Sequence, residues 1–152
     1  MDKWDVRFME MAHTIAGWSS CYRAGRSIGS VIVKDKRIMT TGYNGAPAGM
    51  KTCRDRQECL RDKLGIDSGT RMEICYAVHA EQNAIIQAAK LGVSIDGATL
   101  YCTHQPCSVC AKMIINSGIN RIVYREPYPD PFSLELFEES GIVLEHYARN
   151  EE

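Results

Sequence analysis

The sequence predicts an α/β fold in which a β-sheet is sandwiched by helices. An amphipathic helical stripe near the start is followed by two strand-like runs, and further along the chain strand-like runs alternate with helix-like segments. This order of elements is typical of a sheet that carries helices on its faces. The chain has 152 residues, enough for one domain with a real core, and shows no internal repeat or low-complexity segment.

The first half of the chain is expected to supply one helix and a hairpin. Apolar residues spaced four, three and four apart define the helix: Trp4, Phe8, Met11 and Ile15. This spacing places them on one face, which we expect to pack on the core. Strand-like runs at residues 30–33 and 37–41 flank a turn at 34–36. The glycine-rich loop at residues 42–49 is not expected to be helical.

The polar stretch at residues 50–76 is predicted to be an excursion inserted into the single domain of residues 1–152. It is rich in charge, contains three cysteines and has room for one short helix at residues 54–64. His79 then opens an alanine-rich helix that ends near Leu91, where Gly92 suits a C-terminal cap.

The last third of the chain is expected to alternate strands and helices. A strand at residues 98–103 and a helix at 107–117 are followed by a strand at 119–124. Three prolines between residues 127 and 131 disfavour regular structure. A helix near residues 134–140 and a strand near 142–145 complete the pattern.

Composition narrows the function classes. A formal net charge of −1 gives no global attraction toward nucleic acid, and no apolar run approaches the roughly 20 residues that span a bilayer. The first eleven residues lack the apolar core of a signal peptide, so a cytoplasmic protein without a membrane or nucleic-acid partner is expected. Seven cysteines, an odd number, argue against a full disulfide framework and favour metal ligation.

Three short motifs predict a catalytic zinc site. The motifs supply three ligands of the kinds that zinc prefers: His79, Cys107 and Cys110. Glu81 is a nearby carboxylate that is not needed as a metal ligand. A histidine, a glutamate two residues later and a downstream Pro-Cys-x-x-Cys form the known signature of zinc-dependent base deaminases. Three protein ligands leave the fourth corner of a tetrahedral zinc open for water.

The chemistry expected of this site is hydrolytic deamination. Zinc lowers the pKa of a bound water from about 16 to about 7, so that zinc-bound hydroxide can attack the ring carbon that carries the amine. Glu81 would carry a proton from the water to the ring nitrogen and then to the departing amine. The alternative is a structural zinc closed by a fourth ligand, for which His104 is the candidate; we interpret His104 instead as a neighbour of the site or a lining residue of the pocket.

These residues resemble the cytidine/deoxycytidylate deaminase superfamily, and within it the deoxycytidylate (dCMP) deaminases of the late-competence bacterial type. Residues 42–49 match the pattern GYNGxPxG, residues 79–85 match HAExNAI, and residues 106–115 match PCxxCAKxII. The likeness runs from roughly Ile28 to Tyr124. It implies a three-layer α/β/α sandwich with a central five-stranded mixed sheet, and hydrolysis of dCMP to dUMP and ammonia, which feeds thymidylate synthesis.

The resemblance also implies how the substrate is held and regulated. Asn44 is expected to contact the deoxyribose within a nucleotide site that also includes Tyr43, Gly45 and Ala80. Arg26, with Arg23 as the alternative, is expected to bind the 5′-phosphate. Members of the family form hexamers, and some respond to dCTP and dTTP with Mg²⁺ accompanying the triphosphate, a coupling placed near Tyr124 and Arg125 in this sequence.

Four further cysteines suggest a second zinc. Cys102 is interpreted as a small core residue of its strand, and the cysteines that remain outside the catalytic motif are Cys21, Cys53, Cys59 and Cys75. The excursion that holds the last three has few apolar residues of its own, and regulated members of the family carry a second zinc in this area. We therefore hypothesise a closed four-thiolate zinc, with free buried thiols as the alternative.

Three other functions are weighed against dCMP deamination. A tRNA adenosine deaminase would use the same chemistry but would need a basic surface that faces RNA. Free cytidine deaminases usually place a cysteine at the position of His79. A non-catalytic accessory of competence would leave Glu81 and the open coordination position without a purpose.

Overall fold

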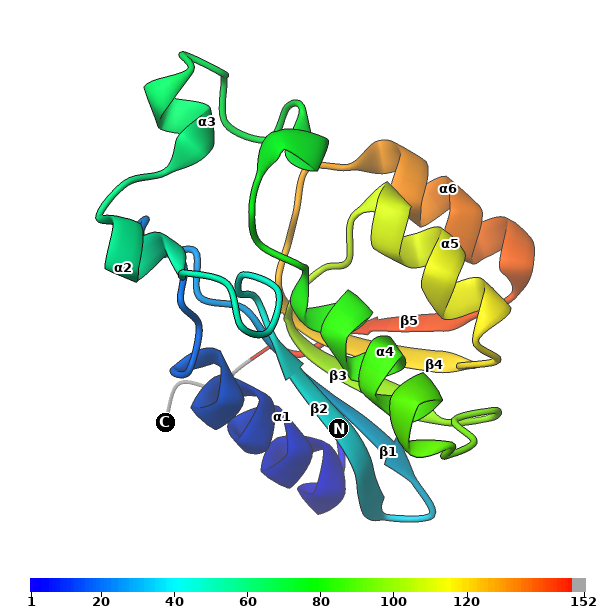
Figure 1. Cartoon of the computed structure of the whole chain (residues 1–152). Helices are drawn as coiled ribbons and strands as arrows, with labels where there is room; N and C mark the ends of the chain where they lie inside the picture. The colour runs from blue at the N-terminus through cyan, green and yellow to red at the C-terminus, as the bar shows by residue number, and fades with distance from the viewer. Residues whose placement is uncertain (149–152) are drawn as a thin grey trace.

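The computed structural model describes residues 1–148, which form one five-stranded mixed sheet (Figure 1). In chain order its strands are β1 (Gly29–Lys34), β2 (Arg37–Tyr43), β3 (Thr99–His104), β4 (Arg121–Glu126) and β5 (Val143–His146). Their spatial order is β2-β1-β3-β4-β5. β1 runs antiparallel to β2 and β3, whereas β3, β4 and β5 run parallel, so the expected mixed sheet is confirmed.

Helix α1 (Lys3–Ala16) covers one face of the sheet. Its residues Phe8, Ala12 and Ile15 pack against Val31 and Tyr101 of the strands. Met11, which the sequence pattern placed on this face, is 39% exposed. The buried arc is centred on Ala12, and at about 100° per residue Met11 lies roughly 100° away from that centre. The helix is therefore confirmed, but the prediction that Met11 belongs to its buried face was wrong.

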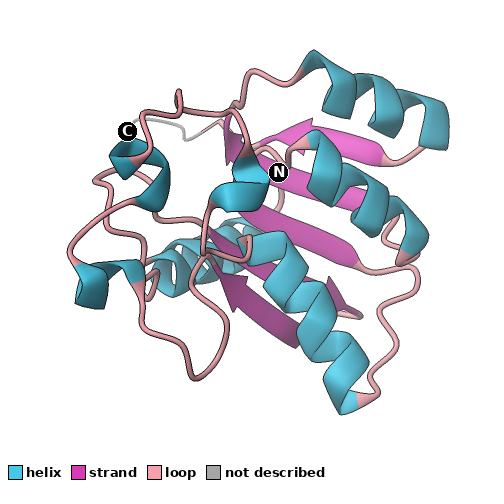
Figure 2. Cartoon of the chain, turned by 45° about the horizontal axis from the view of Figure 1, so that its top comes forward, coloured by secondary structure: helices cyan, strands magenta, loops and turns pink. Residues whose placement is uncertain are grey.

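Three helices cover the opposite face: α4 (Ala80–Leu91), α5 (Ser108–Asn116) and α6 (Pro131–Ser140). Their apolar residues form the larger core, in which Ile114 and Phe137 pack with Leu100 and Ile122 of the sheet. With α1 behind the sheet and these helices in front, the α/β/α sandwich is confirmed (Figure 2).

Helix α6 begins three residues earlier than expected, because Pro131 starts the helix instead of preventing it. Asp130 is the N-cap, and its carboxylate accepts a hydrogen bond from the backbone N–H of Ser133. Proline suits the first helical position, where its missing N–H would have no partner within the helix. The prediction of irregular structure up to Leu134 was therefore wrong.

The segment of residues 50–76, called the inserted segment below, contains two single-turn helices and a 3-10 turn instead of one helix. These are α2 (Cys53–Arg56), α3 (Leu60–Lys63) and Met72–Ile74. Gln57 ends α2 in the left-handed conformation, with φ of 54°. In Figure 1 the segment extends beyond the end of the sheet at which α4 begins.

β2 and the first turn of α4 lie unusually close together. A Cβ on Gly42 would lie 2.1 Å from the carbonyl oxygen of Ala80, so only glycine allows this approach. The contact fixes the start of α4, and therefore His79, against the sheet.

Among residues 1–148, none of the helices is both long enough and apolar enough to span a bilayer.

Candidate metal centre

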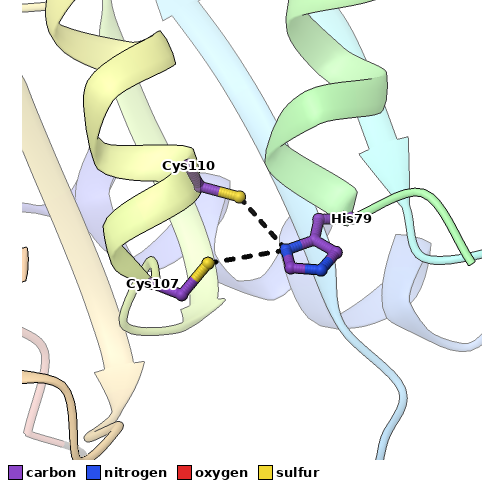
Figure 3. A group of neighbouring side chains, drawn as sticks. All are labelled: His79, Cys107 and Cys110. Atoms are coloured by element: carbon purple, nitrogen blue, oxygen red, sulfur yellow. Dashed lines mark hydrogen bonds between the residues drawn. The ribbon is translucent and has the colours of Figure 1, made fainter. Parts of the chain in front are cut away.

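Three metal-ligating side chains meet where two helices begin. His79 is the N-cap of α4, Cys107 is the N-cap of α5, and Cys110 lies in the first turn of α5. Nδ1 of His79 lies 3.2 Å from Sγ of Cys110 and 3.6 Å from Sγ of Cys107 (Figure 3). All three ligand atoms lie within 4.8 Å of one another.

This donor set fits zinc. In a tetrahedral site with sulfur at about 2.3 Å and nitrogen at about 2.0 Å from the ion, the two ligand atoms are about 3.5 Å apart. The two nitrogen–sulfur distances bracket that value. His104 is not a member of this group, which is the one cluster of three or more such ligands found within residues 1–148. Three protein ligands are typical of a catalytic zinc.

The surroundings favour a thiolate at Cys107. A hydrogen bond from Cys110, together with one from His79, lowers the pKa of the Cys107 thiol to about 4. The same contacts act in reverse on the partners: the hydrogen bond with Cys107 raises the pKa of His79, and also that of Cys110, where burial adds to the rise. The N-terminus of α5 also favours negative charge at this position. The thiolate is the form in which cysteine binds a metal.

Glu81 lies beside the cluster without belonging to it. Its side chain is buried, with 4% of the residue exposed. Oε1 accepts a hydrogen bond from Sγ of Cys102 at 3.0 Å, and Oε2 accepts one from Sγ of Cys110 at 3.4 Å. His79 has extended backbone angles (φ −67°, ψ 153°), because it precedes the helix. The histidine and the glutamate can therefore approach one region although they are two residues apart.

A cavity of about 400 Å³ opens above these groups, a volume typical of small-molecule sites. His79, Glu81 and Cys107 are among its lining residues, together with His104 at the end of β3 and Tyr128 from the loop that follows β4. Burial lowers the pKa of His104, which favours the neutral imidazole. The inserted segment supplies much of the remaining wall.

The residues predicted to bind substrate divide into two groups. Asn44 and Arg26 line the cavity, whereas Tyr43, Gly45 and Ala80 are not among its lining residues in the described chain. Oδ1 of Asn44 accepts a hydrogen bond from the backbone N–H of Ile28 at 2.9 Å, and Nδ2 donates to the carbonyl of Arg26 at 2.6 Å. Asn44 therefore also holds the backbone that carries Arg26.

The four cysteines assigned to a second zinc all line this same cavity. Burial raises the pKa of the Cys53 thiol, and the sulfurs of Cys75, Cys21 and Cys59 raise it further, so the four lie close enough to interact electrostatically. Their sulfurs do not form a group within ligand distance in the part of the chain described.

Tyr124 and Arg125, placed near the expected effector coupling, contact the outer elements of the fold. The ring of Tyr124 contacts that of His146 in a tilted arrangement, with centroids 5.3 Å apart. Nη1 of Arg125 lies 3.1 Å from Nε2 of His13 on α1.

Two features of the site were not predicted. Arg61 of the inserted segment is buried and lines the cavity, although in the sequence it resembles any other charge of a polar stretch. Cys102 is a buried residue of β3, as expected, but it also donates to Glu81. Side chains along a strand point alternately to the two faces of the sheet, and in the sequence only this rule could have suggested that Cys102 lies on the face covered by α4.

Comparison with known proteins identifies the family. A model described as the cytidine and deoxycytidylate deaminase zinc-binding region matches residues 2–126. ComE operon protein 2 of Bacillus subtilis is 42% identical over 149 residues, which cover 97% of this chain and 73% of that protein. Deoxycytidylate deaminase of Schizosaccharomyces pombe is 36% identical over 95% of this chain, which spans only 44% of that protein.

A solved structure has the same fold. It is the dCMP deaminase of the cyanophage S-TIM5 in complex with dCMP and dUMP, which is 30% identical and matches with a TM-score of 0.79. The match covers 97% of this chain and 99% of the phage enzyme.

Proposed function

This chain belongs to the cytidine and deoxycytidylate deaminase family, and on that basis we propose that it hydrolyses dCMP to dUMP and ammonia. The main support for the proposal is the cluster of His79, Cys107 and Cys110 beside the buried carboxylate of Glu81, next to a cavity that His79, Glu81 and Cys107 line. Relatives named deoxycytidylate deaminase and the phage enzyme that binds dCMP support the choice of substrate.

Zinc would be held by Nδ1 of His79 and the sulfurs of Cys107 and Cys110. When bound, it supplies a Lewis acid that lets water ionise near neutral pH. Glu81 is the proton carrier. Cys102 keeps its proton, because burial raises its pKa well above the usual value, and its thiol holds Oε1 of Glu81. We therefore assign to Oε2 the transfer of a proton from water to the ring nitrogen, and then to the leaving amine.

The charge of the cavity suits a nucleotide. Arg23, Arg26 and Arg61 line it, whereas Glu81 is the one acidic side chain among the lining residues described. A 5′-phosphate is a dianion that guanidinium groups bind with charge-assisted hydrogen bonds. Arg23 already pairs with Asp62 at 2.7 Å, so Arg26 is the better candidate of the two predicted arginines. Asn44 is assigned to the deoxyribose.

Ammonia release from a panel of substrates tests this function. The zinc-loaded chain is incubated with dCMP, cytidine, dCTP and an RNA hairpin, each with and without dCTP as an effector. We expect dCMP to be the preferred substrate. Preference for the hairpin or for cytidine would assign the chain to tRNA adenosine or free cytidine deamination, and no release from any substrate would favour the competence accessory.

Several finer properties rest on the family resemblance. These are the homohexamer, stimulation by dCTP, inhibition by dTTP and Mg²⁺ bound with the triphosphate. The incubations with and without added dCTP in the same assay test the response to dCTP.

A second, structural zinc is also part of the proposal. Cys21, Cys53, Cys59 and Cys75 surround one part of the cavity, and a four-thiolate zinc would tie the inserted segment to the sheet. Because the helices of this segment have only one turn each, they contribute little stability of their own.

Metal analysis of matched variants tests the second zinc. We expect two zinc ions per wild-type chain and one in Cys59→Ser, whose inserted segment should become more sensitive to protease. Cys107→Ser should also retain one ion, and the double variant none. A value of one zinc per wild-type chain would rule out the second site.

A further inference from the structure

Arg61 is an arginine buried at the wall of the cavity. It belongs to α3 of the inserted segment, and only 5% of the residue is exposed. Nη1 donates to the carbonyl oxygen of Thr70 at 3.3 Å and lies 3.0 Å from Sδ of Met72. Nε is buried and has no hydrogen-bond partner. The guanidinium is therefore removed from water with part of its donor capacity unused.

In the described part of the chain, no carboxylate forms an ion pair with this guanidinium. Within residues 1–148 neither Arg61 nor Arg26 forms an ion pair, whereas Arg23, on the same cavity, pairs with Asp62. An arginine cannot lose its proton to escape the cost of burial. An unpaired buried charge is expensive, and an anion in the cavity would remove that cost.

Arg26 and Arg61 face a common part of the cavity. Burial raises the pKa of Tyr128, and the positive charges of Arg26 and Arg61 both oppose that rise, which places the phenol in the field of each. Nη2 of Arg26 donates to the hydroxyl of Ser68 in the inserted segment. The Tyr128 hydroxyl also lies 3.6 Å from the position of a Cβ built on Gly69. The inserted segment therefore closes over the side of the cavity where Arg26 lies.

We infer that Arg61 is a second guanidinium for the 5′-phosphate of the substrate, so that the inserted segment determines the requirement for a phosphorylated nucleotide. This inference rests on the proposed deamination of dCMP. Arg26 comes from the segment before β1 and Arg61 from the inserted segment, so two separate segments of the chain each bring a guanidinium group to the same cavity. Two guanidinium groups can share the oxygens of one dianion with charge-assisted hydrogen bonds.

Arg61→Gln tests the inference when it is measured with dCMP and with deoxycytidine, which lacks the phosphate. We expect kcat/KM for dCMP to fall on the order of 10- to 100-fold, mainly through KM, because one charge-assisted interaction is lost. Activity toward deoxycytidine should change little. The product dUMP should inhibit the variant more weakly, whereas inhibition by deoxyuridine should be unchanged, and Arg61→Lys should restore part of the loss.

Arg71→Gln is the matched control, since Arg71 lies in the same segment but is exposed and pairs with Glu73. Zinc content and thermal unfolding of each variant report on folding. A loss shared equally between dCMP and deoxycytidine, or unchanged inhibition by dUMP, would show that Arg61 only packs the segment. A wild-type chain inactive toward dCMP would instead overturn the proposed function and this inference with it.

Discussion

Glu81→Ala is expected to retain zinc and to lose deamination of dCMP, with kcat reduced on the order of 10²- to 10⁴-fold, the range for loss of a general acid–base group. Glu81 is buried beside the ligands but is not one of them, so its removal leaves all three metal-binding atoms in place. Zinc content per chain and steady-state turnover, measured on the same preparation, check both halves of the prediction.

Two further variants serve as comparisons for Glu81→Ala. Glu73→Ala removes an exposed carboxylate of the inserted segment and should leave turnover unchanged. Glu81→Gln keeps the size of the side chain but cannot carry the proton, so it should be as inactive as the alanine variant. Undiminished turnover in Glu81→Ala with full zinc content would remove Glu81 from the mechanism.

His79→Ala is expected to lose the catalytic zinc and with it all measurable deamination. Among residues 1–148 three protein ligands gather at the site, and the loss of one leaves two thiols that cannot hold the ion in a catalytic arrangement. Metal analysis should show one zinc fewer per chain than in the wild type.

The matched control for this variant is His146→Ala, because His146 lies on β5, is exposed and contacts the carbonyl of Arg125. It should keep the wild-type zinc content and activity. Turnover in His79→Ala at the wild-type rate, after removal of loosely bound metal, would contradict the proposed centre.

Local patterns predicted most of the fold because their signals lie within one element. The strand-like runs at residues 30–33 and 37–41 and the turn predicted at 34–36 are such signals. In the structure Lys34 belongs to β1, and Asp35 and Lys36 form the turn with the positive φ values typical of a hairpin. The prediction of helix α6 was wrong at its start, because proline can either break a helix or begin one. Pro131 was interpreted as a helix breaker, although proline is equally suited to the first position of a helix.

The motifs predicted which residues form the candidate site, but not the contacts between distant segments. His79, Cys107 and Cys110 were found because their spacing carries the signal. Arg61 was missed because its burial depends on how the inserted segment folds around the cavity, which no periodicity encodes. For the same reason, the use of Asn44 as a support for the backbone of Arg26 could not be predicted.

The oxygen that enters the product gives the most direct test of the central claim, that this chain hydrolyses dCMP. The zinc-loaded wild-type chain is incubated with dCMP in water enriched in ¹⁸O, and dUMP and ammonia are quantified. We predict equal amounts of the two products, with one oxygen of the base of dUMP carrying the same fraction of ¹⁸O as the solvent water. Absence of dUMP, or dUMP that carries no solvent oxygen, would contradict the account.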